Sequence, residues 1–209
     1  MKKGHMIVCD GSNGAGKTTI LKAIEAHLVS RGYEIVVTRE PGGTPVGERI
    51  REVVLSPATP ELCATTELML FAAARAQHVR EKILPAIEAG KVVISDRFDA
   101  ATVSFQHYAR GLSLDLINQL NAMALDGFRP DMNIILDLDP ALGIERVTAR
   151  GEGLDRMENE KLEFLHKARI GYLEQAEKDP QHFAVVDASQ PLEDVISAVI
   201  EIIDRVVVN

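Results

Sequence analysis

A glycine-rich stretch near the N-terminus has residues of the types and spacing that bind phosphate groups. It reads GSNGAGKT over positions 11–18, which fits the pattern G-x-x-x-x-G-K-[ST] and directly follows an apolar, strand-like run. Such a loop turns backbone N–H groups inward around an anion, while Lys17 supplies a charge to the β- and γ-phosphates and Thr18 offers a hydroxyl to Mg²⁺. The stretch therefore predicts a nucleoside triphosphate site, formed by Gly11, Ser12, Asn13, Gly14, Ala15, Gly16, Lys17, Thr18 and Thr19.

Four arginines form a second group of candidate residues. Arg39 in TREPGG and Arg97 in SDRF directly follow strand-like runs, and Arg51 and Arg75 lie in helix-like segments. An acceptor that is itself a phosphate attacks with an oxygen that is already ionised, so it needs little general-base catalysis but several cations to hold two polyanions together. The planar fork of arginine holds phosphate oxygens bidentately. Although one arginine alone is more often a solvated surface residue, the set predicts a second phosphate site.

Asp96 closes the apolar run VVISD in the manner of a Walker B carboxylate, which could hold hydrated Mg²⁺. Asp137 and Asp139 follow a later apolar run and are weaker candidates, and Asp139 is better interpreted as a helix cap before Pro140. We therefore expect Thr18 and Asp96 to hold the metal ion.

Residues 146–158, RVTARGEGLDRME, have the composition of a mobile lid. Gly151 and Gly153 interrupt a helical pattern, and arginines flank the interruption. Arg150 and Arg156 in such a lid would exclude water and stabilise charge on a transferring phosphoryl group. The spacing alone equally allows an ordinary helix–loop–helix with solvated charges.

The elements that must position these residues alternate along the chain. The strand candidates are nearly continuously apolar, as in parallel strands covered on both faces, and span 5–10, 34–38, 91–96, 132–138 and 182–187. The helix candidates span about 17–31, 45–55, 65–89, 113–126, 140–150, 158–178 and 191–206. This alternation predicts an α/β fold with a doubly wound parallel sheet, in which ligands bind at the carboxyl ends of the strands.

Length and composition limit the classes of function. The 209 residues are enough for one α/β domain, and we expect a single domain over 1–209. The formal net charge of −8 argues against a general nucleic-acid or membrane-surface binder, because both surfaces are anionic. No apolar run suits a signal peptide or a membrane span, and Cys9 and Cys63 lack metal-ligand spacing. A reducing, cytoplasmic setting is therefore expected.

Several of these segments resemble the thymidylate kinases, along nearly the whole chain. The matching segments are TREPGG (38–43), FAAARAQ (71–77), SDRF (95–98), FRPDMNIILDLDP (128–140) and LDRME (154–158), the last followed by Phe164, Arg169 and Tyr172. The lid is similar to that of the bacterial type, which carries its arginines there. The resemblance implies the P-loop nucleoside monophosphate kinase fold, with a five-stranded parallel sheet flanked by helices. It also implies that ATP with Mg²⁺ phosphorylates dTMP, giving dTDP and ADP for dTTP biosynthesis, in a cytoplasmic homodimer.

The resemblance assigns roles at the base and sugar of dTMP. It implies that Phe71 stacks on the base and that Arg75 donates to the pyrimidine O4, where cytosine would present a donor instead. Their i,i+4 spacing puts both residues on one helix face, although periodicity alone would also allow Phe71 to be a core residue. Thr102 falls where the family contacts the N3 edge, and Phe105 where an aromatic ring disfavours a 2′-hydroxyl.

At the phosphates, the resemblance places Arg39, Arg51 and Arg97 on the dTMP phosphate and the transferring group. Glu40 matches a position near the acceptor and the water network of Mg²⁺, although it could instead cap a helix. Together with Lys17 and the lid arginines, Arg97 and Glu40 are the expected catalytic residues.

Two positions depart from the family pattern. Asn13 stands where the family usually has Asp or Glu, which accepts from the 3′-hydroxyl of the substrate; Asn keeps an acceptor oxygen but has no charge. Ala101 stands where the family has Ser. The departures leave room for a related kinase acting on a modified deoxyuridylate or a nucleoside. A non-catalytic P-loop nucleotide-binding module is a further alternative, which the arginines and the Phe71/Arg75 pair disfavour.

Overall fold

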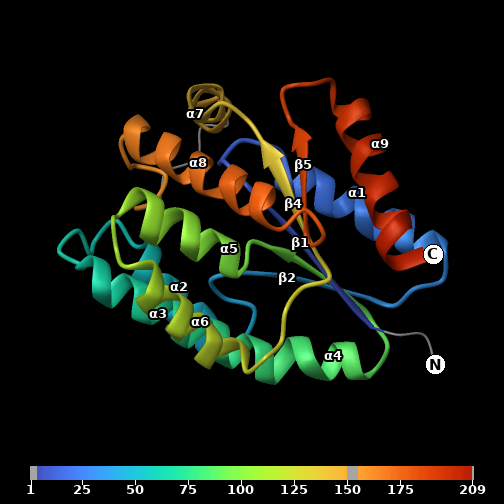
Figure 1. Cartoon of the computed structure of the whole chain (residues 1–209), viewed down its shortest axis with the longest axis horizontal. Coiled ribbons are helices and arrows are strands. Elements are labelled where there is room, and N and C mark those ends of the chain that lie inside the picture. The colour runs from blue at the N-terminus through green and yellow to red at the C-terminus, as the bar shows by residue number, and fades with distance from the viewer. Residues whose placement is uncertain (1–3, 150–154, 209) are drawn as a thin grey trace.

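The computed structural model describes residues 4–149 and 155–208, and its centre is a five-stranded parallel sheet with helices on both faces (Figure 1). The strands lie in the order β2-β3-β1-β4-β5, and neighbouring strands pair in parallel. Their bounds are β1 (His5–Gly11), β2 (Ile35–Arg39), β3 (Val92–Asp96), β4 (Met132–Asp137) and β5 (Phe183–Asp187). The structure thus confirms the five predicted strands, each to within one residue at either end.

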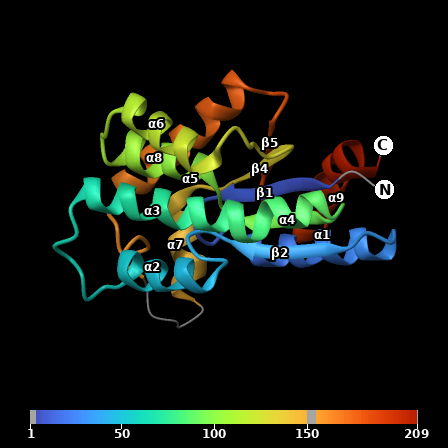
Figure 2. The same cartoon turned by 90° about the horizontal axis from the view of Figure 1, so that it is seen from below.

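Most helices also lie where periodicity predicts them. They are α1 (Lys17–Ser30), α2 (Pro45–Leu55), α3 (Ala64–His78), α4 (Leu84–Glu88), α5 (Asp99–Thr102), α6 (Leu114–Leu125), α7 (Pro140–Thr148), α8 (Leu162–Lys178) and α9 (Leu192–Ile203), with π-helical segments η1 (Val79–Ile83), η2 (Val103–Ala109) and η3 (Asp204–Val208). The helix predicted over 65–89 is α3, η1 and α4 in succession, which run in one line in Figure 2. The helix predicted over 158–178 begins only at Leu162.

One helical stretch was not predicted. Residues 99–109 form α5 and η2 directly after β3. Thr102, Val103, Phe105 and Tyr108 in this stretch have lower helix propensity than its alanines, and no side chain caps its first turn. Packing against α8 therefore decides its structure, and Phe105 of η2 lies edge-on to Tyr172 of α8, with ring centroids 6.1 Å apart.

The core lies on both faces of the sheet because side chains alternate along each strand. In β1, Ile7 and Cys9 pack in a cluster with residues of α1 and α9, whereas Met6 and Val8 pack in a cluster with residues of η1 and β3. All four side chains are fully buried. The near-continuous apolar character of the predicted strands follows from this two-sided burial.

Two further expectations concern α7 and the lid. Asp139 caps α7, since its side chain accepts from the backbone N–H of Ala141 at 2.8 Å, as predicted. The lid expected over 146–158 lies only partly within the structure, because 150–154 are outside the described residues; a single domain with a mobile lid stays a prediction.

Within the described ranges, none of the helices is long and apolar enough to cross a membrane.

Candidate active site

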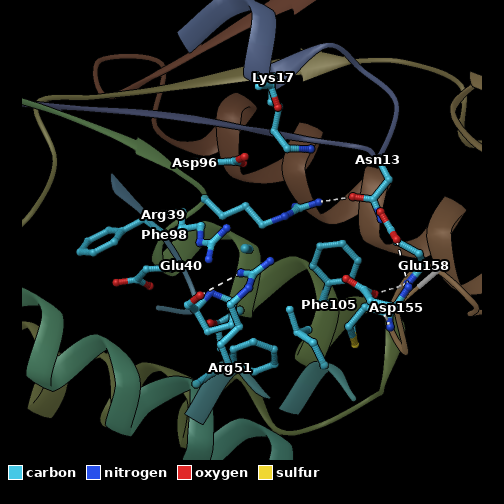
Figure 3. Close-up of a pocket in the computed structure, with 18 of the residues that line it drawn as sticks. Asn13, Lys17, Arg39, Glu40, Arg51, Asp96, Phe98, Phe105, Asp155 and Glu158 are labelled. Carbon is cyan, nitrogen blue, oxygen red and sulfur yellow. Dashed lines mark hydrogen bonds between the residues drawn. The ribbon is translucent and has the colours of Figure 1, made fainter. Parts of the chain in front are cut away.

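A cavity of about 250 Å³ opens at the carboxyl ends of β1, β2 and β3. Figure 3 shows Lys17 and Asp96 on one side of it and Arg51 on the other, with Asp155 and Glu158 at the end nearest Asn13. The predicted residues that line this cavity are Asn13, Gly14, Gly16, Lys17, Thr18, Arg39, Glu40, Arg51, Phe71, Arg75, Asp96, Arg97, Thr102 and Phe105. The fold thus brings the triphosphate loop, the arginines and the proposed base pocket into one space.

The phosphate loop has a conformation that requires glycine. Gly11 and Gly14 have φ of 127° and 77°, and a Cβ at these positions would lie 2.3 Å from the carbonyl oxygen of Leu136 and 2.4 Å from that of Gly143. Four of the loop residues predicted to bind the triphosphate, Gly11, Ser12, Ala15 and Thr19, do not line the cavity.

Lys17 folds back under this loop. Its Nζ donates to the carbonyl oxygens of Gly11 at 3.3 Å and Ser12 at 3.0 Å. Burial, with a smaller contribution from the positive charge of Arg97, lowers the pKa of Lys17 to about 8. Asp96 and Asp10 act in the opposite direction and offset this shift only in part, so the negative charge of an incoming phosphate would further favour the protonated form.

Asp96 and Thr18 offer oxygen ligands at the cavity. The Oδ1 atom of Asp96 is buried and has no hydrogen-bond partner among the described residues. Thr18 is the second residue of α1, is exposed and lines the same cavity. A carboxylate and a hydroxyl are hard donors of the kind that Mg²⁺ takes while keeping most of its waters and binding substrate phosphates. The two residues therefore fit the ion that the sequence predicts.

Arg97 is held by residues that the sequence analysis did not connect with it. Its backbone adopts φ 67°, an unusual conformation for a non-glycine residue, of the kind that clusters at functional sites. Nη1 donates to Oδ1 of Asp10 at 2.9 Å and to the Tyr172 hydroxyl at 2.8 Å, and Nη2 donates to Oδ1 of Asn13 at 2.7 Å. Asp10 is a strand-end acid like Asp96, and that shared pattern was the signal that could have identified it.

The carboxylate of Asp10 is itself fully buried. The Tyr172 hydroxyl donates to its Oδ1 at 2.5 Å, and the backbone N–H of Gly11 donates to the same atom at 2.9 Å. Burial raises the pKa of Asp10, while Arg97 and Tyr172 act in the opposite direction by favouring the charged form. These contacts fix the position of the Arg97 guanidinium at the cavity wall.

Arg75 is almost completely buried, with 2% of its surface exposed, and its donors are nearly all engaged. Nε donates to Glu40 and Nη1 to Asn121, both at 2.8 Å, and Nη2 donates to the Phe98 carbonyl at 3.1 Å and to Thr102 at 2.9 Å. A guanidinium has five N–H groups, so these contacts within the described residues leave one N–H of Nη1 for a ligand. Asn121 lies 46 residues away in sequence, and no local pattern indicated its role.

Glu40 joins Arg75 to the loop after β2. Its other oxygen, Oε1, contacts Nδ1 of the buried His78 at 2.9 Å, and Nε2 of that ring contacts Thr38 at 2.7 Å. Glu40 also precedes a cis peptide bond to Pro41, whose carbonyl oxygen accepts from Arg51 at 2.8 Å. The loop thereby places Arg51 at the cavity. His78 is a further residue that the sequence analysis did not single out.

The remaining predicted residues differ in their exposure. Arg39 is half exposed and pairs with Glu48 at 2.8 Å. Phe71, one turn before Arg75 in α3, lines the cavity, and the Arg97 guanidinium lies 5.1 Å from the centroid of Phe105.

The predicted lid arginines are placed differently from the others. Arg150 lies outside the described residues. Arg156 does not line the cavity: its Nε and Nη2 donate to the carbonyl oxygen of Val54 at 2.9 and 2.8 Å, and Nη2 also reaches Glu67. Its expected contact with the transferring phosphoryl group stays a prediction.

Comparison with known proteins points to one family. A sequence model described as thymidylate kinase matches residues 9–199. The thymidylate kinase of Hahella chejuensis is 48% identical and that of a Geobacillus species 43% identical, each over 199 residues and 95% of both chains. The crystal structure of thymidylate kinase from Ehrlichia chaffeensis superposes with a TM-score of 0.77 at 30% identity, covering 97% of this chain and 99% of that one.

Proposed function

The chain belongs to the thymidylate kinase family, and on that premise we propose that it transfers the γ-phosphoryl group of ATP to dTMP, giving dTDP and ADP. One observation of the site carries the proposal most strongly. Lys17 of the phosphate loop, Arg97 after β3 and the nearly buried Arg75 line one cavity. A triphosphate, a second phosphate and a nucleobase can therefore be bound in the same cavity.

On the donor side, the phosphate loop and the N-terminus of α1 would bind the triphosphate, with Lys17 as the charge at the β- and γ-phosphates. Thr18 and Asp96 would hold Mg²⁺, a role supported by the unpartnered Oδ1 of Asp96. When bound, Mg²⁺ neutralises charge on the β- and γ-phosphate oxygens.

On the acceptor side, Arg97, Arg51 and Arg39 would hold the dTMP phosphate. The transfer needs positioning more than acid–base chemistry, because the attacking phosphate oxygen is already ionised. Arg97 has the most rigid placement of the three, since Asp10, Asn13 and Tyr172 fix its guanidinium. Glu40 would act on the acceptor chiefly by orienting Arg75.

Base selection would depend on the one N–H of Arg75 that stays available. A thymine O4 accepts that hydrogen bond, whereas the amino group of cytosine would leave two donors facing each other. Phe71, one turn earlier in α3, lines the cavity where it could stack on the ring.

We further propose a cytoplasmic homodimer. Met69 of α3 and Met123 of α6 are 53% and 73% exposed on two helices that pack together, which favours coverage by a second copy. Cys63 is an exposed free thiol and Cys9 a buried one, as is usual in a reducing compartment.

An acceptor panel tests the proposed reaction. ADP release from ATP is measured with dTMP, dUMP, UMP, dCMP, AMP and thymidine, and the rate with dTMP should exceed all others. Highest turnover with a different acceptor would assign another kinase activity. No stimulation by dTMP above the rate with ATP alone would reject phosphoryl transfer to dTMP.

A further inference from the structure

A buried carboxylate outside the roles proposed above belongs to Glu67 of α3, a fully buried residue. Gln106 donates to its Oε1 at 2.9 Å, Arg110 donates to both oxygens at 3.1 Å, and Arg156 donates to Oε2. Burial alone would raise the pKa of Glu67, but these hydrogen bonds hold it below its ordinary value. Glu67 is therefore an ionised, fully partnered hub.

Arg156 belongs to a short stretch, residues 155–161, which we call the post-lid segment. The backbone N–H of Arg156 donates to the carbonyl oxygen of Leu55 at 3.1 Å. The side chain of Arg156 donates to the carbonyl oxygen of Val54 and to the carboxylate of Glu67. The same residue thus joins the segment to the C-terminal end of α2 and to α3.

A second ion pair joins this segment to the same hub. Glu160 contacts Nη2 of Arg110 at 2.6 Å, and Arg110 contacts Glu67. The four side chains form a row of alternating charge, Arg156–Glu67–Arg110–Glu160. The row is partly or fully shielded from water, with side-chain exposures of 12%, 1%, 19% and 22%, so its ion pairs are less screened than surface pairs.

The hub lies between two walls of the cavity. Asp155, Met157 and Glu158 of the post-lid segment line the cavity, and so does Gln106 of η2, which donates to Glu67. Glu67 also stands one turn before Phe71, on the helix face that carries the proposed base contacts. A shift of Glu67 would therefore displace both the post-lid segment and the part of the cavity that carries the proposed base contacts.

We propose that Glu67 is a positioning residue: through Arg156 it seats the post-lid segment on α2 and α3 and so completes the acceptor side of the cavity. This inference rests on the proposed function. Arg156 would then anchor the post-lid segment and would not contact the transferring phosphoryl group. The hydrogen bonds of the Arg156 side chain go to Val54, Glu67 and the Met157 sulfur.

A double-mutant cycle tests whether the pair acts as a unit. Glu67→Gln and Arg156→Lys should each lower kcat/KM for dTMP by about tenfold, and the double variant should be no worse than the poorer single variant. If Arg156 instead acts on the phosphoryl group independently of Glu67, the two losses will multiply, which would overturn the proposal.

Hydrogen exchange supplies a readout that does not depend on activity. In the full chain without substrates, the amides of residues 155–158 should exchange about tenfold faster in both variants than in the wild type. The matched control is Glu163→Gln, which breaks an exposed pair with Lys167 at 2.7 Å on α8 and should leave these rates unchanged.

The two readouts separate the possible failures. If Glu67→Gln does not fold, Arg156→Lys leaves Glu67 paired with Arg110 and must still accelerate exchange. Wild-type exchange rates in Arg156→Lys would reject the anchoring role, whatever happens to kcat. Faster exchange in a protein that does not phosphorylate dTMP would retain the anchor and reject the proposed function instead.

Discussion

The amide oxygen of Asn13 accepts a hydrogen bond from Nη2 of Arg97 at 2.7 Å, which ties the phosphate loop to the residue that follows β3. The other terminal nitrogen of Arg97 donates to Asp10 and to the Tyr172 hydroxyl, so the guanidinium has one charged and two neutral acceptors. The family resemblance places a carboxylate at position 13. Because Asn13 is neutral, the phosphate loop of this chain neutralises the positive charge of Arg97 less than a loop with a carboxylate at position 13 would.

Substitution of Asn13 by Asp should increase selectivity for the substrate 3′-hydroxyl. A carboxylate accepts a hydrogen bond more strongly than an amide by about 1 kcal/mol, so the ratio of kcat/KM for dTMP to that for its 3′-deoxy analogue should rise about fivefold. Steady-state kinetics with both acceptors measures this ratio in the wild type and the variant. Equal ratios would show that position 13 does not sense the sugar.

Lys17 should make the stability of the ligand-free protein depend on pH. Its pKa is about 8 in the folded chain, against an ordinary value of 10.5, so between these values the unfolded state binds more protons than the folded state. The contribution of Lys17 to the free energy of unfolding therefore rises with pH between about pH 8 and pH 10.5, by at most about 1.4 kcal/mol per pH unit.

Urea unfolding of the wild type and of Lys17→Met at pH 7.5 and 9.5 isolates this contribution, because other titrating groups are common to both. The free energy of unfolding of the wild type minus that of the variant should increase from pH 7.5 to pH 9.5. A constant difference between the two proteins would mean that Lys17 is not desolvated in the folded state.

Arg75→Lys should weaken dTMP binding and leave ATP binding intact. Lysine keeps a positive charge beside Glu40 but cannot reach Asn121, Thr102 and the base at once, so KM for dTMP should rise about tenfold or more. Discrimination against dCMP should fall as well. The control is Arg129→Lys, at an exposed pair with Asp179, whose constants should match the wild type. An unchanged KM for dTMP would remove Arg75 from base recognition.

Asp96→Asn should raise the Mg²⁺ concentration needed for half-maximal activity by about tenfold, since an amide is a weaker ligand for hydrated Mg²⁺ than a carboxylate. A Mg²⁺ titration at fixed ATP and dTMP measures the shift. Asp126→Asn is a suitable control, because Asp126 is exposed at the end of α6 and asparagine tolerates its φ of 52°. Coincident titration curves for Asp96→Asn and the wild type would exclude Asp96 as the ligand.

The sequence predicts the strands and the residues at their ends more accurately than it predicts what holds those residues. Arg39, Asp96 and Arg97 could be found because parallel strands deliver such residues to one edge of the sheet. Tyr172 contacts Asp10 across 162 positions of sequence, and Asn121 contacts Arg75 across 46, so no local pattern records either pair. The helical stretch 99–109 escaped prediction for a related reason, since packing against α8 overrides weak local propensity.

The fate of the γ-phosphoryl group tests the central claim most directly. The chain is mixed with ATP labelled at the γ-phosphate, Mg²⁺ and dTMP, and the products are separated. The account predicts label in dTDP in amounts equal to the ADP formed, and no transfer by Lys17→Ala under the same conditions. Label appearing only in inorganic phosphate, or equal transfer by the Lys17→Ala variant, would contradict it.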